Sequence, residues 1–120
     1  MRIHHLAFRT RDLTRLEDFY GRVLGLRVTK RDAERSVWLD AGGAIVMLER
    51  CEPDKHEPAI DRASLELTCF ALEPSDFAAI TKRLEDAGVT VEAETAFTIY
   101  LRDPDGRRVG LSSFPQPRVT

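Results

Sequence analysis

The chain has little cysteine, no long apolar run and no excess of charge of either sign. Its two cysteines, Cys51 and Cys69, lack metal-binding spacing, so a disulfide scaffold is excluded and we expect reduced thiols. Eighteen basic and 20 acidic side chains give a net charge of -2, which argues against a nucleic-acid-binding surface. No apolar run approaches the roughly 20 residues of a membrane span. The start of the sequence resembles a strand rather than a signal peptide, so we expect a cytoplasmic protein.

The composition that remains is that of one small globular domain. Hydrophobic residues make up 42% of the sequence and charged residues 32%, an ordinary balance for a soluble protein. A chain of this size buries roughly 65% of the surface that it exposes when unfolded, so it can fold without disulfides or a structural metal. We therefore expect a single domain over residues 1–120.

Residue patterns predict a β-α-β-β-β order in the first half of the chain. Asp12 is placed to cap a helix and Gly25 to end it, with apolar residues at helical spacing between them. Short apolar segments between polar or glycine-rich turns predict the strands. The predicted elements are a strand at 3–10, a helix at 13–24 and strands at 26–30, 36–41 and 44–49.

The same order returns after a polar, proline-containing linker at residues 51–63. Ser75 or Asp76 caps the second predicted helix and Gly88 ends it, while the Asp-Pro-Asp-Gly run at 103–106 predicts a tight turn. The predicted strands are 64–72, 89–93, 97–102 and 107–112. The chain thus divides into a first module at 1–50, the linker at 51–63 and a second module at 64–113.

The two halves match each other at a shift of about 63 residues, so the chain contains one internal repeat. Trp38 corresponds to Tyr100, and Met47 to Gly110. In each module the helix is expected to cover one sheet face and leave the other open. Pairing the two open faces would form a cup, where we expect a small molecule to bind. The sequence therefore predicts an α+β fold of two βαβββ modules.

Three segments of the sequence resemble the vicinal oxygen chelate superfamily. They are the opening strand and helix start at 5–13, the helix and its exit at 18–26, and the last hairpin at 103–109. This superfamily includes glyoxalase I, bleomycin-resistance proteins, fosfomycin-resistance enzymes and extradiol dioxygenases. The resemblance covers nearly the whole chain and implies a cup-shaped mixed sheet with helices on its outer face. It implies the fold more than the activity, because one scaffold hosts many chemistries.

The resemblance also implies where a metal would bind. In metal-using members, four inward-facing side chains bind one divalent ion, one from the first and one from the last strand of each module. His5 matches the first of these positions. The last-strand positions fall on Met47 and on Gly110, where the family's pattern has glutamate. Methionine is a soft ligand and glycine has no side chain, so the complete four-ligand site is not present.

A shifted ligand set is one alternative. Glu49 has the same strand parity as Met47, and Glu66 stands in the first strand of the second module, where Thr68 shares its parity. His5, Glu49 and Glu66 together would give one imidazole and two carboxylates for one divalent ion. The other interpretations are a structural His5–Glu66 pair and a catalytic Glu66 that acts as a general base.

Residues on inward-facing strand positions predict the wall of a ligand pocket. Most are apolar or aromatic and suit an apolar ligand body. Arg108 shares its parity with Gly110; it either binds a carboxylate or phosphate or lies on a solvated rim. The predicted lining is Trp38, Ile45, Met47, Thr68, Tyr100, Arg108 and Gly110.

Three functions follow from these residues and the resemblance. The first is a small-molecule-binding protein of the glyoxalase and bleomycin-resistance type, with a degenerate metal site. The second is a metal-dependent lyase, isomerase or dioxygenase that uses the shifted His5 and glutamate set. The third is a metal-free acid–base enzyme that uses Glu66. We expect a small-molecule ligand, no nucleic-acid or membrane partner, and a homodimer, because an isolated cup leaves strand edges unpaired.

Overall fold

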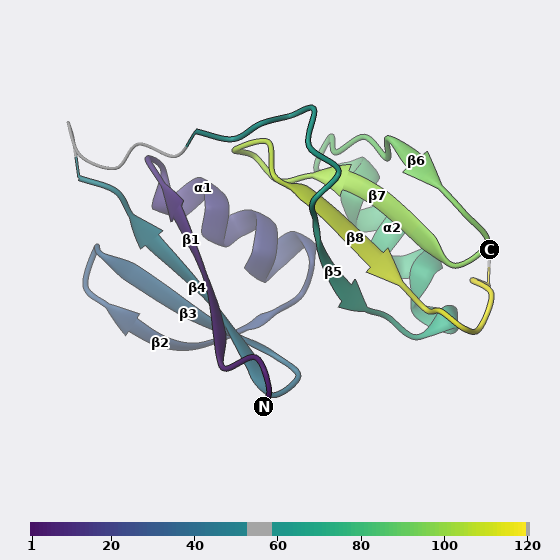
Figure 1. Ribbon diagram of the computed structural model, residues 1–120, viewed down its shortest axis with the longest axis horizontal. Helices are drawn as coiled ribbons and strands as arrows, with labels where there is room; N and C mark the ends of the chain where they lie inside the picture. The colour runs from purple at the N-terminus through teal and green to yellow at the C-terminus, as the bar shows by residue number, and fades with distance from the viewer. Residues whose placement is uncertain (53–58, 120) are drawn as a thin grey trace. The chain divides into compact units, whose positions relative to one another are not determined.

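A computed structural model describes residues 1–52 and 59–119 (Figure 1). The chain forms two compact units, Met1–Ala59 and Ile60–Thr120. Each unit contains one four-stranded mixed sheet together with helical segments, so the α+β fold of two βαβββ modules is confirmed. Residues 53–58 of the predicted linker lie outside the described residues. Among the helices that the structure describes, none combines the length and the apolar character needed to cross a membrane.

The first unit follows the predicted order. In its sheet the strands lie in the order β1-β4-β3-β2, with β1 parallel to β4 and the other pairs antiparallel. Its elements are β1 (His5–Thr10), α1 (Leu13–Glu17), the π-helix η1 (Asp18–Val23), β2 (Arg27–Asp32), β3 (Ser36–Ala41) and β4 (Ala44–Arg50).

The second half of this unit's helical segment is a π-helix, which is wider than the α-helix that the sequence predicts. It starts after Asp12, whose side chain accepts the N–H of Arg15 at 3.0 Å, as a cap does. From residue 18 onward the backbone is π-helical, and the N–H of Leu24 bonds the carbonyl oxygen of Phe19 at 2.9 Å. The sequence therefore predicts the extent of the segment but not its widening.

One face of the first sheet packs against this helical segment. The Tyr20 and Phe8 rings lie 5.6 Å apart, and the side chain of Leu39 reaches the helix beside Gly21. Burying these large apolar groups supplies most of the unit's stabilisation. The buried hydrophobic residues of this unit are Leu16, Phe19, Tyr20, Val23, Val37, Leu39, Val46, Leu48 and Cys51.

The second unit repeats the arrangement with shorter strands. Its sheet has the order β5-β8-β7-β6, with β5 parallel to β8. Its elements are β5 (Thr68–Ala71), the 3-10 turn η2 (Pro74–Asp76), α2 (Phe77–Asp86), β6 (Ala93–Glu94), β7 (Thr98–Arg102) and β8 (Arg108–Ser112). Its core is formed by Phe77, Ile80, Leu84, Ile99, Leu101, Val109 and Leu111.

Two strands of the second unit are shorter than predicted. The predicted strand at 64–72 is limited to Thr68–Ala71, because β8 begins at Arg108 and its ladder with β5 starts at the Thr68–Val109 pair. The predicted strand at 89–93 is reduced to Ala93–Glu94. Ahead of it, the N–H of Val89 still bonds the carbonyl of Leu84 in α2, so this segment serves to end the helix.

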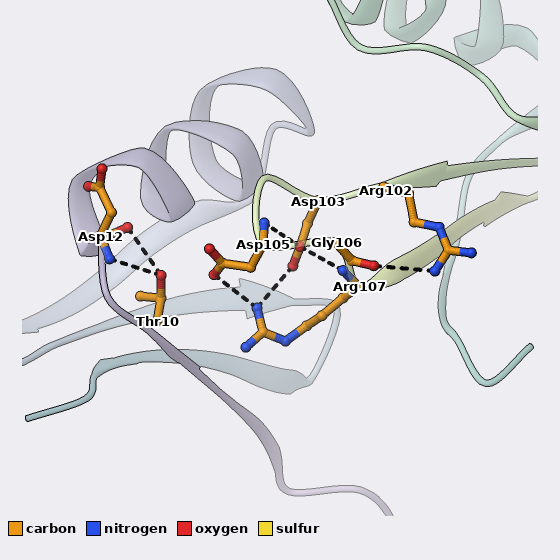
Figure 2. A network of polar contacts seen from close by, with 7 residues as sticks. All are labelled: Thr10, Asp12, Arg102, Asp103, Asp105, Gly106 and Arg107. Atoms are coloured by element: carbon orange, nitrogen blue, oxygen red, sulfur yellow. Dashed lines mark hydrogen bonds and ion pairs between the residues drawn. The ribbon is translucent and has the colours of Figure 1, made fainter. Parts of the chain in front are cut away.

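The predicted turn at 103–106 joins β7 to β8 and is built around a buried carboxylate (Figure 2). Asp103 accepts the backbone N–H groups of Asp105 and Arg107, both at 2.9 Å, and also lies 3.2 Å from the Arg107 guanidinium. Gly106 has a φ of 99°, a left-handed conformation that glycine adopts without strain. The turn thereby fixes the register of the hairpin that carries Tyr100 and Gly110.

Candidate functional site

The first sheet presents a second face, on the side opposite its own helix. Strand pairing places Ala7 beside Met47 and Met47 beside Trp38, so the three form a row across β1, β4 and β3. Ile45 lies two residues from Met47 on the same face, and Trp38, Ile45 and Met47 are all half-buried. We call these four residues, Ala7, Trp38, Ile45 and Met47, the helix-free face of the first unit. Three of the predicted pocket residues are brought together there.

Charged groups lie around this face. The ammonium of Lys30 lies 4.9 Å from the centre of the Trp38 ring, a cation–π contact. Arg9 and Glu49 form an ion pair at 3.5 Å. The face therefore combines an apolar centre with a polar margin, which suits an amphipathic small molecule better than a lipid surface.

The second unit has the equivalent row. Cys69 pairs with Gly110, and Gly110 pairs with Tyr100, so these residues correspond to Ala7, Met47 and Trp38. Arg108 lies on the same face, and its guanidinium is 4.3 Å from the centre of the Tyr100 ring. We call Cys69, Tyr100, Arg108 and Gly110 the helix-free face of the second unit. In both units a cationic side chain lies over the aromatic ring on the third strand of the module: Lys30 over Trp38, and Arg108 over Tyr100.

Gly110 has no side chain, so the helix-free face of the second unit has a gap above its backbone, which we call the notch. A Cβ atom at Gly110 would lie 2.8 Å from Leu67 Cδ1 and 3.0 Å from Cys69 Sγ. Side chains from the segment before β5 and from β5 itself thus fill the space that a larger residue would need. Leu67 and Cys69 were missed by the sequence analysis, although their parity with Gly110 follows once the start of β5 is known.

Two residues that the sequence predicts for the site, Thr68 and Glu66, are not part of the helix-free faces. Thr68 pairs with the fully buried Val109, so it lies on the helix side of the sheet, away from Gly110. Glu66 precedes β5, is exposed, and its backbone N–H bonds Ser64 Oγ at 3.1 Å. Cys69 corresponds to Ala7, and His5 lies two residues before Ala7. The residue equivalent to His5 is therefore Leu67, two residues before Cys69, rather than Glu66.

Within the first unit, the described positions of His5 and Glu49 do not bring the two side chains to one divalent metal ion. His5 pairs with Ile45, four residues before Glu49, which separates the two backbones by roughly 13 Å at the strand rise of about 3.3 Å per residue. His5 Nδ1 instead lies 2.9 Å from His4 Nδ1, and Glu49 pairs with Arg9. Within either unit, the described residues include no group of three His, Cys, Asp or Glu that could hold a metal.

Two cavities lie beside the helices rather than at the helix-free faces. One, of about 500 Å³, lies along α2, and its lining includes Phe77, Ile99 and Arg118. The other, of about 400 Å³, lies at the start of α1 and is lined mainly by charged groups such as Arg31 and Glu17. Neither cavity is lined by a residue predicted to bind the ligand.

Cys69 of the second helix-free face has a raised pKa. Partial burial raises the pKa of its thiol above the ordinary value, because a thiolate loses solvation beside apolar groups. The thiol remains protonated near neutral pH, so Cys69 suits a role as a neutral contact rather than as a nucleophile.

Comparison with known proteins agrees with this fold. The family model "Glyoxalase/Bleomycin resistance protein/Dioxygenase superfamily" matches residues 2–111. The glutathione transferase FosA of Serratia marcescens is 29% identical over 113 residues, which span 91% of this chain and 78% of that protein.

Two solved structures show the same fold. A glyoxalase/dioxygenase from Nostoc punctiforme aligns with a TM-score of 0.76 and 19% identity over 92% of this chain and 88% of its own. The fosfomycin resistance protein FosX of Mesorhizobium loti aligns with a TM-score of 0.72 and 19% identity over 93% of this chain and 90% of its own.

Proposed function

Because this chain belongs to the Glyoxalase/Bleomycin resistance protein/Dioxygenase superfamily, we propose that it is a small-molecule-binding protein that works without the family's divalent ion. Each unit has a helix-free sheet face to which a ligand can bind. The observation that carries this proposal is the row of Ala7, Met47 and Trp38, an apolar surface that the unit's own helix does not cover.

The helix-free face of the first unit suits the apolar part of a ligand. Trp38 offers a flat aromatic ring, and Met47 offers a flexible thioether that adapts to the shape of a ligand. Ile45 extends the surface toward His5. Burying apolar ligand area on this face provides the affinity, at roughly 25 cal/mol per Å².

The second unit supplies a more polar face. Tyr100 and Arg108 form a stacked pair, and the space at Gly110 beside Tyr100 is filled by Leu67 and Cys69. Thr68, on the other side of the sheet, is left out of the proposed site. We further propose a cytoplasmic homodimer. Two cysteines do not make a disulfide scaffold, which fits a reducing compartment, and edge strands such as β1 and β2 can pair with a second copy.

A ligand screen tests the proposal. We would measure the melting temperature of the protein with a panel of amphipathic small molecules and determine Kd for those that raise it. Trp38→Ala is expected to weaken binding at least about tenfold, because a buried aromatic contact is lost. Phe114→Ala, which removes an exposed aromatic ring of the C-terminal tail, serves as the matched control and leaves Kd unchanged. A panel without a single stabilising compound would refute the proposal.

The two enzymatic alternatives make different predictions. A metal-free acid–base enzyme would lose turnover in Glu66→Gln while still binding its ligand. A metal-dependent enzyme would lose metal and turnover together in His5→Ala. In a binding protein, both substitutions leave the affinity within a few-fold of the original.

A further inference from the structure

The segment at residues 62–67, which we call the strap, is held in place by arginine side chains instead of a strand ladder. The Arg102 guanidinium donates to the carbonyl of Arg62 at 3.0 Å, and Arg108 donates to the carbonyl of Leu65 at 3.2 Å. Both arginines come from the β7–β8 hairpin, where they pair with each other across the two strands. The strap is therefore attached to the second unit by side-chain bonds that a competing acceptor can replace.

Leu67 of the strap occupies the notch at Gly110. Its Cδ1 atom lies 2.8 Å from the position that a Cβ atom of residue 110 would take, closer than two such atoms can pack. Leu67 nevertheless remains 40% exposed and the neighbouring Leu65 is 76% exposed. The strap thus covers Gly110 with one leucine that is only partly buried, and moving it away costs little apolar contact.

Arg108 is oriented for an oxygen acceptor before any ligand arrives. Its guanidinium lies over the Tyr100 ring at 4.3 Å, which restricts its rotation, and it already donates to one carbonyl oxygen. A guanidinium can offer two parallel N–H groups to a carboxylate or phosphate, whereas the bond to Leu65 uses a single neutral acceptor. An oxyanion is therefore a stronger partner for Arg108 than the strap carbonyl that it now bonds.

The surrounding charge also favours an anion. Arg62 lies against Gly106, and Arg102 lies across the ladder from Arg108, so three guanidinium groups gather at this end of the hairpin. Arg102 forms an ion pair with Glu92 at 3.1 Å. Arg107 at the same turn is paired with Asp103 and Asp105. Arg108 bonds a neutral carbonyl oxygen, so its positive charge can attract an anionic ligand.

We propose that the ligand carries an oxyanion, either a carboxylate or a phosphate monoester, on an apolar body. The oxyanion binds Arg108 by displacing the Leu65 carbonyl, and the apolar body displaces Leu67 from the Gly110 notch. Binding therefore releases the strap. This inference rests on the proposed function and adds to it the chemical class of the ligand and a conformational step.

Three probes with one aromatic body distinguish the ligand chemistries. Benzoate, phenyl phosphate and the neutral benzamide would be titrated into the ¹⁵N-labelled protein, and Kd would be taken from amide chemical shifts. Benzoate or phenyl phosphate is expected to bind at least about tenfold more tightly than benzamide, the ratio that a charge-assisted hydrogen bond supports. Whichever anion binds more tightly identifies the source of the oxyanion.

Three variants test the roles of Arg108 and of the two strap leucines. Arg108→Gln is expected to abolish the preference for anions, leaving benzoate and benzamide within about twofold of each other. Leu67→Ala is expected to tighten benzoate binding several-fold, because the notch is already vacant. Leu65→Ala keeps the backbone carbonyl and removes an exposed side chain, so it is the matched control and leaves Kd unchanged.

Hydrogen exchange tests the release of the strap. The Glu66 amide bonds Ser64 Oγ within the strap at 3.1 Å, and its exchange is expected to speed up when benzoate is bound. Equal binding of benzoate and benzamide, an unchanged preference in Arg108→Gln, or slower exchange at Glu66 would each overturn the inference. If neutral compounds then bind and Trp38→Ala weakens their binding, the proposed function holds although this inference fails.

Discussion

The carboxylate of Asp103 and the guanidinium of Arg107 lie 3.2 Å apart at the turn between β7 and β8, with the Asp103 side chain fully buried. The same carboxylate also accepts two backbone N–H groups of the turn. The hairpin that carries the second helix-free face thus depends on one buried acid.

We expect Asp103→Ala to destabilise the protein by about 3 kcal/mol, because the turn amides and Arg107 lose their shared acceptor. Urea unfolding followed by circular dichroism measures the change. Asp105→Ala is the comparison variant: its carboxylate bonds the same Arg107 at 3.2 Å, but the two turn amides bond Asp103, so its cost should be smaller than that of Asp103→Ala. Equal costs for the two variants would contradict this account of the turn.

Gly110→Ala tests the notch. The new methyl group would meet Leu67 Cδ1 at 2.8 Å, so we expect a loss of about 1 kcal/mol in unfolding free energy as the leucine is displaced. Adding Leu67→Ala to Gly110→Ala should recover part of that loss, because the contact that causes it is gone. A double-mutant cycle by urea unfolding measures the coupling. Strictly additive costs would show that the two positions do not share this space.

The raised pKa of Cys69 predicts slow alkylation. At a given pH a higher pKa leaves less thiolate, so the rate with iodoacetamide near neutral pH should be lower than for the same cysteine in urea-unfolded protein. As the pH rises, the rate in the folded protein should reach its midpoint later than in the unfolded protein. Peptide mapping by mass spectrometry separates Cys69 from the buried Cys51. Identical pH profiles in the two states would refute the shift.

The amount of metal that the protein retains tests whether His5 and Glu49 can hold a divalent ion. After incubation with Mn, Fe, Co, Ni or Zn and desalting, we expect less than one metal per chain, because His5 and Glu49 are held by other partners. The His5→Ala variant should retain the same amount as the original protein. Elemental analysis of the untagged protein provides the measurement. Stoichiometric metal that disappears in His5→Ala would instead support the metal-dependent alternative.

Most of the fold could be predicted from local sequence signals. The helix cap at Asp12 is observed, and the turn at 103–106 forms where its residues predict it. The correspondence of Trp38 with Tyr100 and of Met47 with Gly110 is confirmed by equivalent strand pairs. These features depend on neighbouring residues or on strict alternation, which a sequence carries directly.

The register of β5 could not be predicted in the same way. Glu66 and Leu67 belong to a segment with apolar alternation, so the sequence favours a strand from residue 64. Whether that segment joins the sheet depends on where β8 begins, far away in the sequence. A change of one residue in parity moves each side chain to the opposite face, which exchanges Glu66 and Thr68 for Leu67 and Cys69.

The filled notch at Gly110 also limits how the site can change over time. The family's pattern has a glutamate at this position, but a side chain introduced here would collide with Leu67 before it could act as a ligand. A longer side chain at position 110 therefore requires Leu67 to move or to be replaced by a smaller residue. The residues tolerated at position 110 thus depend on the residue at position 67.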